Sequence, residues 1–205
     1  MHQPARTIER NAWSWLCGLL LLFSGWSVAW AQVNSAEVTQ LQVERTEEGV
    51  LLSASVRFDL PQVVDDALAK GIPMYFVAEA SIYRDRWYWY DKRVAFATRH
   101  MRLAYQPLTR RWRLQVSSAP IGNSGIVLGQ NFESRDEALA AMRRISRWRI
   151  ADAGELDPES AHNIDFRFRL DMSQLPRPFQ IGAVGQAEWI ILAVRNQRLV
   201  FEQAK

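Results

Sequence analysis

Alternation between apolar and polar side chains is the main pattern of this sequence beyond residue 37. Every second position is apolar from residue 50 to residue 58, and the pattern returns from residue 164 to residue 170. A period of two residues is typical of a half-buried antiparallel strand. A shorter apolar segment, 38–45, precedes the first of these, with a turn at Gly49 between them. We therefore predict a β-hairpin from the two neighbouring segments and a separate strand later in the chain.

The middle of the chain predicts three more strands. Residues 74–90 and 93–105 are rich in apolar and aromatic side chains, and the turn 106–109 leads into an alternating segment at 112–116. Strands that follow one another through short turns commonly form an antiparallel meander. A last apolar run, 189–194, predicts a strand close to the C-terminus.

Two segments predict helices. Pro61 opens the first, where its missing N–H group costs nothing, and Gly71 stands where a left-handed C-cap is expected. Ser134 and Glu137 form a capping box ahead of the second helix, whose apolar positions recur at helical spacing as far as Trp148. Between the meander and this second helix, residues 120–131 are rich in Gly, Asn and Ser and predict a loop.

Strands therefore outnumber helices, and no alternating βαβ order is present. This combination predicts a mainly β or α+β fold, namely an antiparallel β-sandwich or a barrel-like sheet with two short helices. We expect residues 32–205 to form a single domain, because 174 residues are enough for one core.

The N-terminus has the features of an export signal. Arg6 and Arg10 precede an uncharged stretch that runs to residue 36 and has its most apolar part at residues 19–23. The small residues Ala29 and Ala31 form an A-x-A signal peptidase site, with Gln32 as the new N-terminus. The sequence predicts a cleaved signal peptide over 1–31. The alternative is an uncleaved anchor, since about 20 apolar residues span a bilayer.

Either alternative places the rest of the chain outside the cytoplasm. We expect a protein of the periplasm, or one anchored in the inner membrane and facing the periplasm, that touches the membrane only through its N-terminal segment. The single cysteine, Cys17, lies within the apolar segment, so the exported part cannot form a disulfide. Without Arg6, Arg10 and Glu9 the chain carries 23 basic and 21 acidic side chains. This near balance argues against nucleic acid as a partner.

Catalytic and metal-binding motifs are missing from the sequence. His100 and His162 are the only histidines beyond the signal segment, and they lack the spacing of a metal site. The run 122–125 resembles a nucleophile elbow but lacks its final glycine. Glu79 and Asp85 would lie about 20 Å apart on one strand, whereas a glycosidase pair needs about 5–9 Å. We expect no catalytic residue, no metal and no cofactor.

The most unusual segment is 82–93, where arginines alternate with tryptophans and tyrosines. One interpretation is a cationic aromatic surface for an anionic sugar, a lipid headgroup or an acidic partner, because guanidinium groups bind carboxylate and phosphate and indoles stack on sugars. The other is a structural ladder of guanidinium groups stacked on indole faces. The residues of this candidate ligand or partner surface are Arg84, Arg86, Trp87, Trp89 and Arg93.

Several short motifs resemble DUF4390, a proteobacterial family of exported proteins of unknown function. They are Leu60-Pro61, Gly71-Ile72-Pro73 and Arg86-Trp87-Tyr88-Trp89, together with the helix opened by Ser134 and the Leu-Asp…Leu-Pro run at 170–176. The resemblance covers nearly all of the exported part. The run 188–192 departs from the family's usual C-terminal end. The resemblance carries no established activity, but it implies an accessory role in envelope signalling beside a membrane sensor kinase.

Three functions follow from these observations. The first is a non-enzymatic interaction module of the periplasm or envelope, whose partner is an envelope protein such as a sensor kinase ectodomain. The second is a binding domain for a lipid or an anionic glycan that uses the 84–93 surface. The third is an envelope hydrolase, which would require acidic residues or His100 to meet in a pocket.

Overall fold

A computed structural model of the chain describes residues 36–85, 92–122, 127–157, 160–177, 179 and 189–199. The chain separates into two compact units, Met1–Gln32 and Val33–Lys205, and every described residue belongs to the second. The predicted signal segment, including Ala29, Ala31 and Gln32, therefore lies outside the described residues. Within them, no helix is long and apolar enough to cross a membrane.

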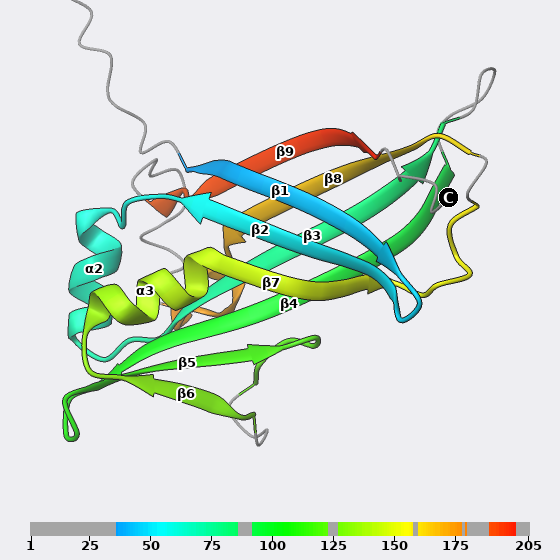
Figure 1. Cartoon of the computed structure of the whole chain (residues 1–205). Coiled ribbons are helices and arrows are strands. Elements are labelled where there is room, and N and C mark those ends of the chain that lie inside the picture. The colour runs from blue at the N-terminus through cyan, green and yellow to red at the C-terminus, as the bar shows by residue number, and fades with distance from the viewer. Residues whose placement is uncertain are drawn as a thin grey trace, which may run out of the picture. The chain divides into compact units, whose positions relative to one another are not determined.

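The described strands form two antiparallel sheets that face each other (Figure 1). The smaller sheet has the order β1-β2-β7, with β1 at Glu37–Thr46, β2 at Gly49–Arg57 and β7 at Arg144–Ala151. The larger sheet has the order β6-β5-β4-β3-β8-β9. Its strands are β3 (Met74–Arg84), β4 (Lys92–Gln106), β5 (Arg111–Ser117), β6 (Gly129–Phe132), β8 (His162–Leu170) and β9 (Leu192–Leu199). The predicted sandwich is confirmed, and the described strands close no barrel.

The predicted hairpin is the β1–β2 pair, and its turn requires glycine. Gly49 has a φ of 131°, in the region that side chains disfavour. A Cβ atom at this position would lie 2.4 Å from the carbonyl oxygen of Ala151 on β7. The turn can therefore approach the neighbouring strand closely only because residue 49 has no side chain.

The first predicted helix is α2, Gln62–Ala69, which follows Pro61 directly. Gly71 has a φ of 83°, as expected for a left-handed C-cap. Its N–H group donates to the carbonyl of Leu68, and the N–H of Ile72 donates to that of Ala67. These two bonds are the Schellman pattern, which satisfies carbonyl groups at the end of the helix.

The second helix, α3, is shorter than predicted. It begins after Ser134, whose hydroxyl accepts from the Glu137 N–H group, and it ends at Arg143. The prediction that it extends to Trp148 was wrong, because β7 starts at Arg144 and pairs with β2. The apolar residues Met142, Ile145 and Trp148 are spaced three apart, which fits a helix. The backbone hydrogen bonds that residues from 144 onward can form with β2 favour a strand instead.

Two other predictions needed correction at the ends of elements. The expected loop 120–131 contains the start of β6, a short polar strand that pairs with β5. The last strand, β9, starts three residues later than expected, and Trp189 and Ile191 are buried ahead of it. Strand β3 ends at Arg84, and residues 86–91 lie outside the described part.

Three phenylalanine rings lie at the centre of the core, and we call them the phenylalanine cluster. Phe58 follows β2, whereas Phe76 and Phe168 lie on β3 and β8. The ring centroids are 5.9 Å apart for Phe58–Phe76, 5.4 Å for Phe58–Phe168 and 5.7 Å for Phe76–Phe168. All three are at most 2% exposed. The cluster therefore joins the chain that leaves the smaller sheet to two neighbouring interior strands of the larger one.

Two described buried residues are polar, Gln115 and His162. The side chain of Gln115 accepts from Arg102 and donates to the carbonyl of Val127. His162 on β8 is 1% exposed, and neither of its ring nitrogens forms a hydrogen bond of ordinary geometry with a described residue.

Burial lowers the pKa of His162 below its ordinary value of 6.5, and the charge of Arg84 acts in the same direction. The backbone of Ser160 and the charges of Asp157 and Asp85 oppose this lowering of the pKa only in part.

We expect Phe168→Ala to lower the free energy of unfolding by about 3–5 kcal/mol, because it opens a cavity in the phenylalanine cluster. Phe96→Ala is the matched control, since Phe96 on β4 is 51% exposed. The control should cost about 1 kcal/mol or less. Urea denaturation of both variants measures the difference, and equal losses would show that the cluster is not the centre of stability.

We also expect the protein to lose stability as the pH falls below about 6.5. A histidine whose pKa is lowered by folding binds more protons in the unfolded state, so protonation favours unfolding. His162→Phe removes this group and should flatten the dependence of melting temperature on pH. The effect is expected over the range in which an ordinary histidine titrates, roughly pH 7.5 to 5.5. If wild type and variant fall in parallel over this range, His162 is not responsible.

Candidate functional site

The structure describes two of the five residues of the predicted surface, Arg84 and Arg93. Arg86, Trp87 and Trp89 lie outside the described residues. Arg84 pairs with His162 on β8, whereas Arg93 pairs with Tyr83 on β3. Because neighbouring residues of a strand alternate in direction, Arg84 and Arg93 point to opposite faces of the larger sheet. These two arginines therefore do not form one continuous surface.

Their contacts are local. The Nη1 atom of Arg84 lies 4.0 Å from an oxygen of Asp157, and Arg84 is half-buried. The exposed Arg93 places its guanidinium group 4.9 Å from the centre of the Phe96 ring. Such a cation–π contact at an exposed site contributes about 0.5–1 kcal/mol.

Arginine–tryptophan stacking is present, but between strands that are distant in sequence. Arg99 on β4 lies 5.8 Å from the ring of Trp148 on β7. The arginines next to Trp148 in sequence pair elsewhere: Arg147 lies 3.7 Å from Glu44, and Arg149 lies 3.7 Å from Asp152. Adjacent residues of a strand point to opposite faces, so sequence neighbours could not supply the stack.

A polar cluster lies on the outer face of the larger sheet. Arg169 on β8 bridges Glu79, at 3.1 Å, and Asp171, at 3.5 Å. Asp171 also accepts hydrogen bonds from Ser173 and Gln174 in the short 3-10 helix η1, Met172–Gln174. These contacts hold the chain that leaves β8 against the sheet.

The titration of the polar cluster fits this structural role. Burial alone would raise the pKa of Asp171, but its hydrogen bonds from Ser173 and Gln174 and the charge of Arg169 outweigh burial, so the pKa is lowered. Burial lowers the pKa of His100 on the same face, although the charges of Asp171 and Glu79 oppose this. Asp171 is thus held ionised, whereas a general acid needs a raised pKa.

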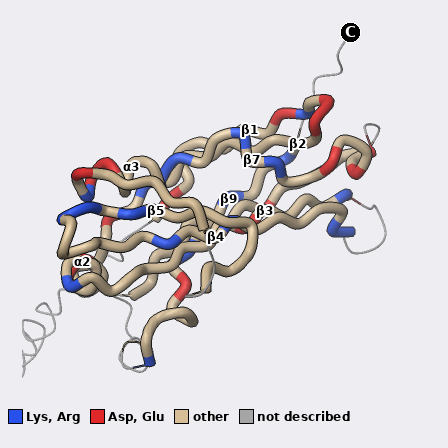
Figure 2. The backbone as a smooth tube through the Cα atoms, turned by 90° about the horizontal axis from the view of Figure 1, so that it is seen from below, with Lys and Arg blue, Asp and Glu red and all other residues tan. Residues whose placement is uncertain are grey.

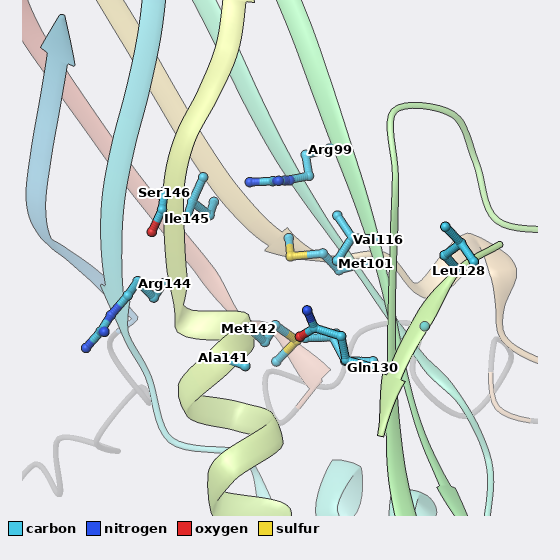
Figure 3. A pocket seen from close by; sticks show the side chains of 12 residues that line it. Arg99, Met101, Val116, Leu128, Gln130, Ala141, Met142, Arg144, Ile145 and Ser146 are labelled. Carbon is cyan, nitrogen blue, oxygen red and sulfur yellow. The ribbon is translucent and has the colours of Figure 1, made fainter. Parts of the chain in front are cut away.

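A groove of about 400 Å³ lies on the inner side of the larger sheet (Figure 3). Met101 on β4 and Leu114 and Val116 on β5 form its floor. One wall comes from α3 and the start of β7, and the opposite rim from residues 128–130 at β6. We call this feature the groove. It is candidate binding space because apolar floors with few polar groups are typical of ligand sites.

The groove exists because the two sheets differ in width. Strands β5 and β6 extend beyond the three strands of the smaller sheet, and α3 covers only part of them (Figure 1). Met101 and Leu114 are buried at 3% and 5% exposure, whereas Val116 is 39% and Leu128 is 90% exposed. The groove is therefore open along one side.

Arg99 is the charged group that faces into the groove, as Figure 3 shows. It lies two residues before Met101 on the inner face of β4, and it is half-buried. Burial lowers the pKa of its guanidinium group. Among the described residues, no carboxylate forms an ion pair with Arg99. Its cationic head is therefore in contact with an indole ring but not neutralised.

The surroundings of the groove are basic. Arg144 also lines it, although its side chain points away in Figure 3, and no described lining residue is acidic. Strand β7 carries three arginines and no carboxylate. Acidic positions gather instead near the β1–β2 turn and at the start of α3 (Figure 2).

None of the residues that line the groove belongs to the surface predicted from the sequence. A signal was present, because residues 95, 97, 101 and 103 of the inner face of β4 are apolar and only position 99 interrupts them with an arginine. The groove itself could not be found in this way, since it depends on how far one sheet extends past the other.

Comparison with known proteins agrees with the resemblance seen in the sequence. A family model described as "Domain of unknown function (DUF4390)" matches residues 33–198. No curated protein and no solved structure matches the chain. The matched segment covers well over half of the chain and all of the described strands except the last residue of β9. The chain therefore belongs to the DUF4390 family.

Proposed function

We propose that this protein is a non-enzymatic interaction module of the cell envelope, which binds a segment of an envelope protein in the groove. The ectodomain of a membrane sensor kinase is the partner class that fits an accessory role. The observation that carries the proposal is the groove itself, an apolar floor beside a half-buried Arg99 that forms no ion pair with any carboxylate in the described part of the chain. Apolar surface that is open and rimmed by polar groups is typical of binding sites.

The lining of the groove supports binding more than catalysis. Its polar side chains are two arginines, Gln130 and Ser146, all of which donate hydrogen bonds. A general base or a metal site would need a carboxylate, histidine or cysteine, and no described lining residue is one of these. The carboxylates of the polar cluster lie on the outer face of the sheet and are occupied by Arg169 and by the chain after β8.

A lipid or anionic glycan is the second candidate, because an unpaired cation also attracts a small anion. Two observations make this candidate weaker. The groove is open, so an acyl chain would stay largely in water, whereas small-molecule sites bury most of their ligand. A glycan would need a free indole face to stack on. The Trp148 ring already has the guanidinium group of Arg99 over it.

In-cell photo-crosslinking tests the proposed function. A photoreactive residue at Gln130, on the rim of the groove, should capture one recurrent envelope protein, identified by mass spectrometry of the adduct. Gln42 on the outer face of β1 is the matched control, since it is also an exposed glutamine. We expect the adduct at residue 130 and not at residue 42.

The other outcomes contradict the proposal in different ways. The same adduct at residue 42 alone would place the interaction on another face. Lipid adducts without protein at residue 130 would favour the second candidate. No adduct at residue 130, in cells where the protein is folded and abundant, would show that the groove is not an interaction site.

A further inference from the structure

Arg99 indicates what kind of group the partner presents. Arginine side chains buried away from water are usually paired, because the cost of removing the charge from water must be offset. Arg99 is half-buried, and the described residues offer it an indole ring but no carboxylate. A carboxylate is the complementary group, since a guanidinium fork binds it through two parallel hydrogen bonds.

The positive charge of the groove lining also favours an acidic partner. Arg99 and Arg144 line the groove, and no described lining residue is acidic. The other two arginines of β7 are each within 3.7 Å of a carboxylate and do not line it. A basic segment would meet like charges here, which is unfavourable, whereas an acidic segment would be attracted from a distance. The partner's carboxylate is therefore expected from an acidic side chain or a chain end.

The free edge of β7 favours an extended peptide as occupant. Among the described strands β7 pairs only with β2, and Figure 3 shows the groove on its other side. Peptides commonly bind such an edge with their backbone and place alternate side chains in pockets. An acyl chain could not use these backbone groups, nor the side chains of Ser146 and Gln130.

The structure also limits how far such a segment could pair. Arg147 has a φ of 43°, and the β2–β7 register shifts between the pairs Leu52–Trp148 and Ala54–Ile145. This bulge interrupts the regular edge of β7 after Ser146. Pairing along β7 is therefore confined to the start of the strand, beside the groove.

We propose that the groove binds a short, extended, acidic segment of the partner protein, with a carboxylate on Arg99 and apolar side chains on Met101 and Val116. This inference rests on the proposed function and specifies the partner's chemistry. Its basis is the combination in one place of a cation without an ion-pair partner among the described residues, an apolar floor, and a strand edge to which no described strand pairs.

A phage-displayed library of random linear peptides, selected on the purified protein, tests the inference. Enriched peptides should share an Asp or Glu next to alternating apolar residues. Arg99→Gln should weaken their binding about ten- to a hundredfold, as expected for loss of a hydrogen bond to a charged group. The matched control is Arg167→Gln, an exposed arginine on the outer face of the same sheet, which should leave the affinity unchanged.

A double-mutant cycle then identifies the contact. Replacing the peptide's acidic residue by its amide should weaken binding to the wild type by a similar factor and have little further effect on Arg99→Gln. Because Arg99→Gln also removes the stack on Trp148, melting temperatures are compared. Val116→Glu is a second variant that keeps Arg99 and places a competing carboxylate on the floor, and it should abolish peptide binding.

Several results would overturn the inference. These are enriched peptides without a carboxylate, binding that Arg99→Gln leaves unchanged, displacement of the peptides by laurate at equal concentration, or a selection that yields no peptide sensitive to Val116→Glu. The crosslink at residue 130 is independent of them. If that crosslink still captures an envelope protein, the interaction module stands and only the acidic linear segment is wrong.

Discussion

Apolar contact between the inner faces of the two sheets holds this domain together, and its other features depend on that contact. The only cysteine, Cys17, precedes the domain, so no disulfide supplements the core. The phenylalanine cluster provides the largest rings at the centre of the contact, and Arg143 at the end of α3 packs its guanidinium group 4.9 Å from the Phe58 ring. The same arginine donates to the Phe58 carbonyl, which fixes the helix end to the core.

The two sheets differ in width, with three strands against six. The core draws on β4, β3, β8 and β9 of the larger sheet, whereas β5 contributes only Leu114 to its buried residues. Strand β5 pairs with β4, β6 pairs with β5, and α3 covers them in part. Val116 and Leu128 stay exposed beside the buried floor of the groove, and this exposed apolar surface supports the binding function that we propose.

Polar groups inside the sandwich differ in how they are accommodated. Arg169 neutralises two carboxylates on the outer face, and its network fixes the chain after β8. Arg99 has an indole contact and forms no ion pair with a described carboxylate, and His162 is only 1% exposed. A buried polar group without a full set of partners costs stability. For Arg99 we propose that a ligand supplies the partner, and for His162 we expect burial to make stability depend on pH.

Local patterns in the sequence determined much of the fold. Alternation over 50–58 and 164–170 predicted the strands, and Gly71 and Ser134 predicted helix ends correctly, because turns, caps and strand faces depend on residues close in sequence. The sandwich followed from the number of strands and the lack of βαβ order. Family membership could also be seen from short motifs.

Tertiary structure alone decided the remaining features. The segment 144–148 fits a helix by its spacing, but it became a strand because β2 offered it backbone partners. Arg99 stacks on Trp148 and faces a groove because two residues 49 positions apart in sequence, on β4 and β7, are brought together across the sandwich. The groove depends on the relative widths of two sheets, and that is set by long-range pairing and packing, which no local pattern of residues encodes.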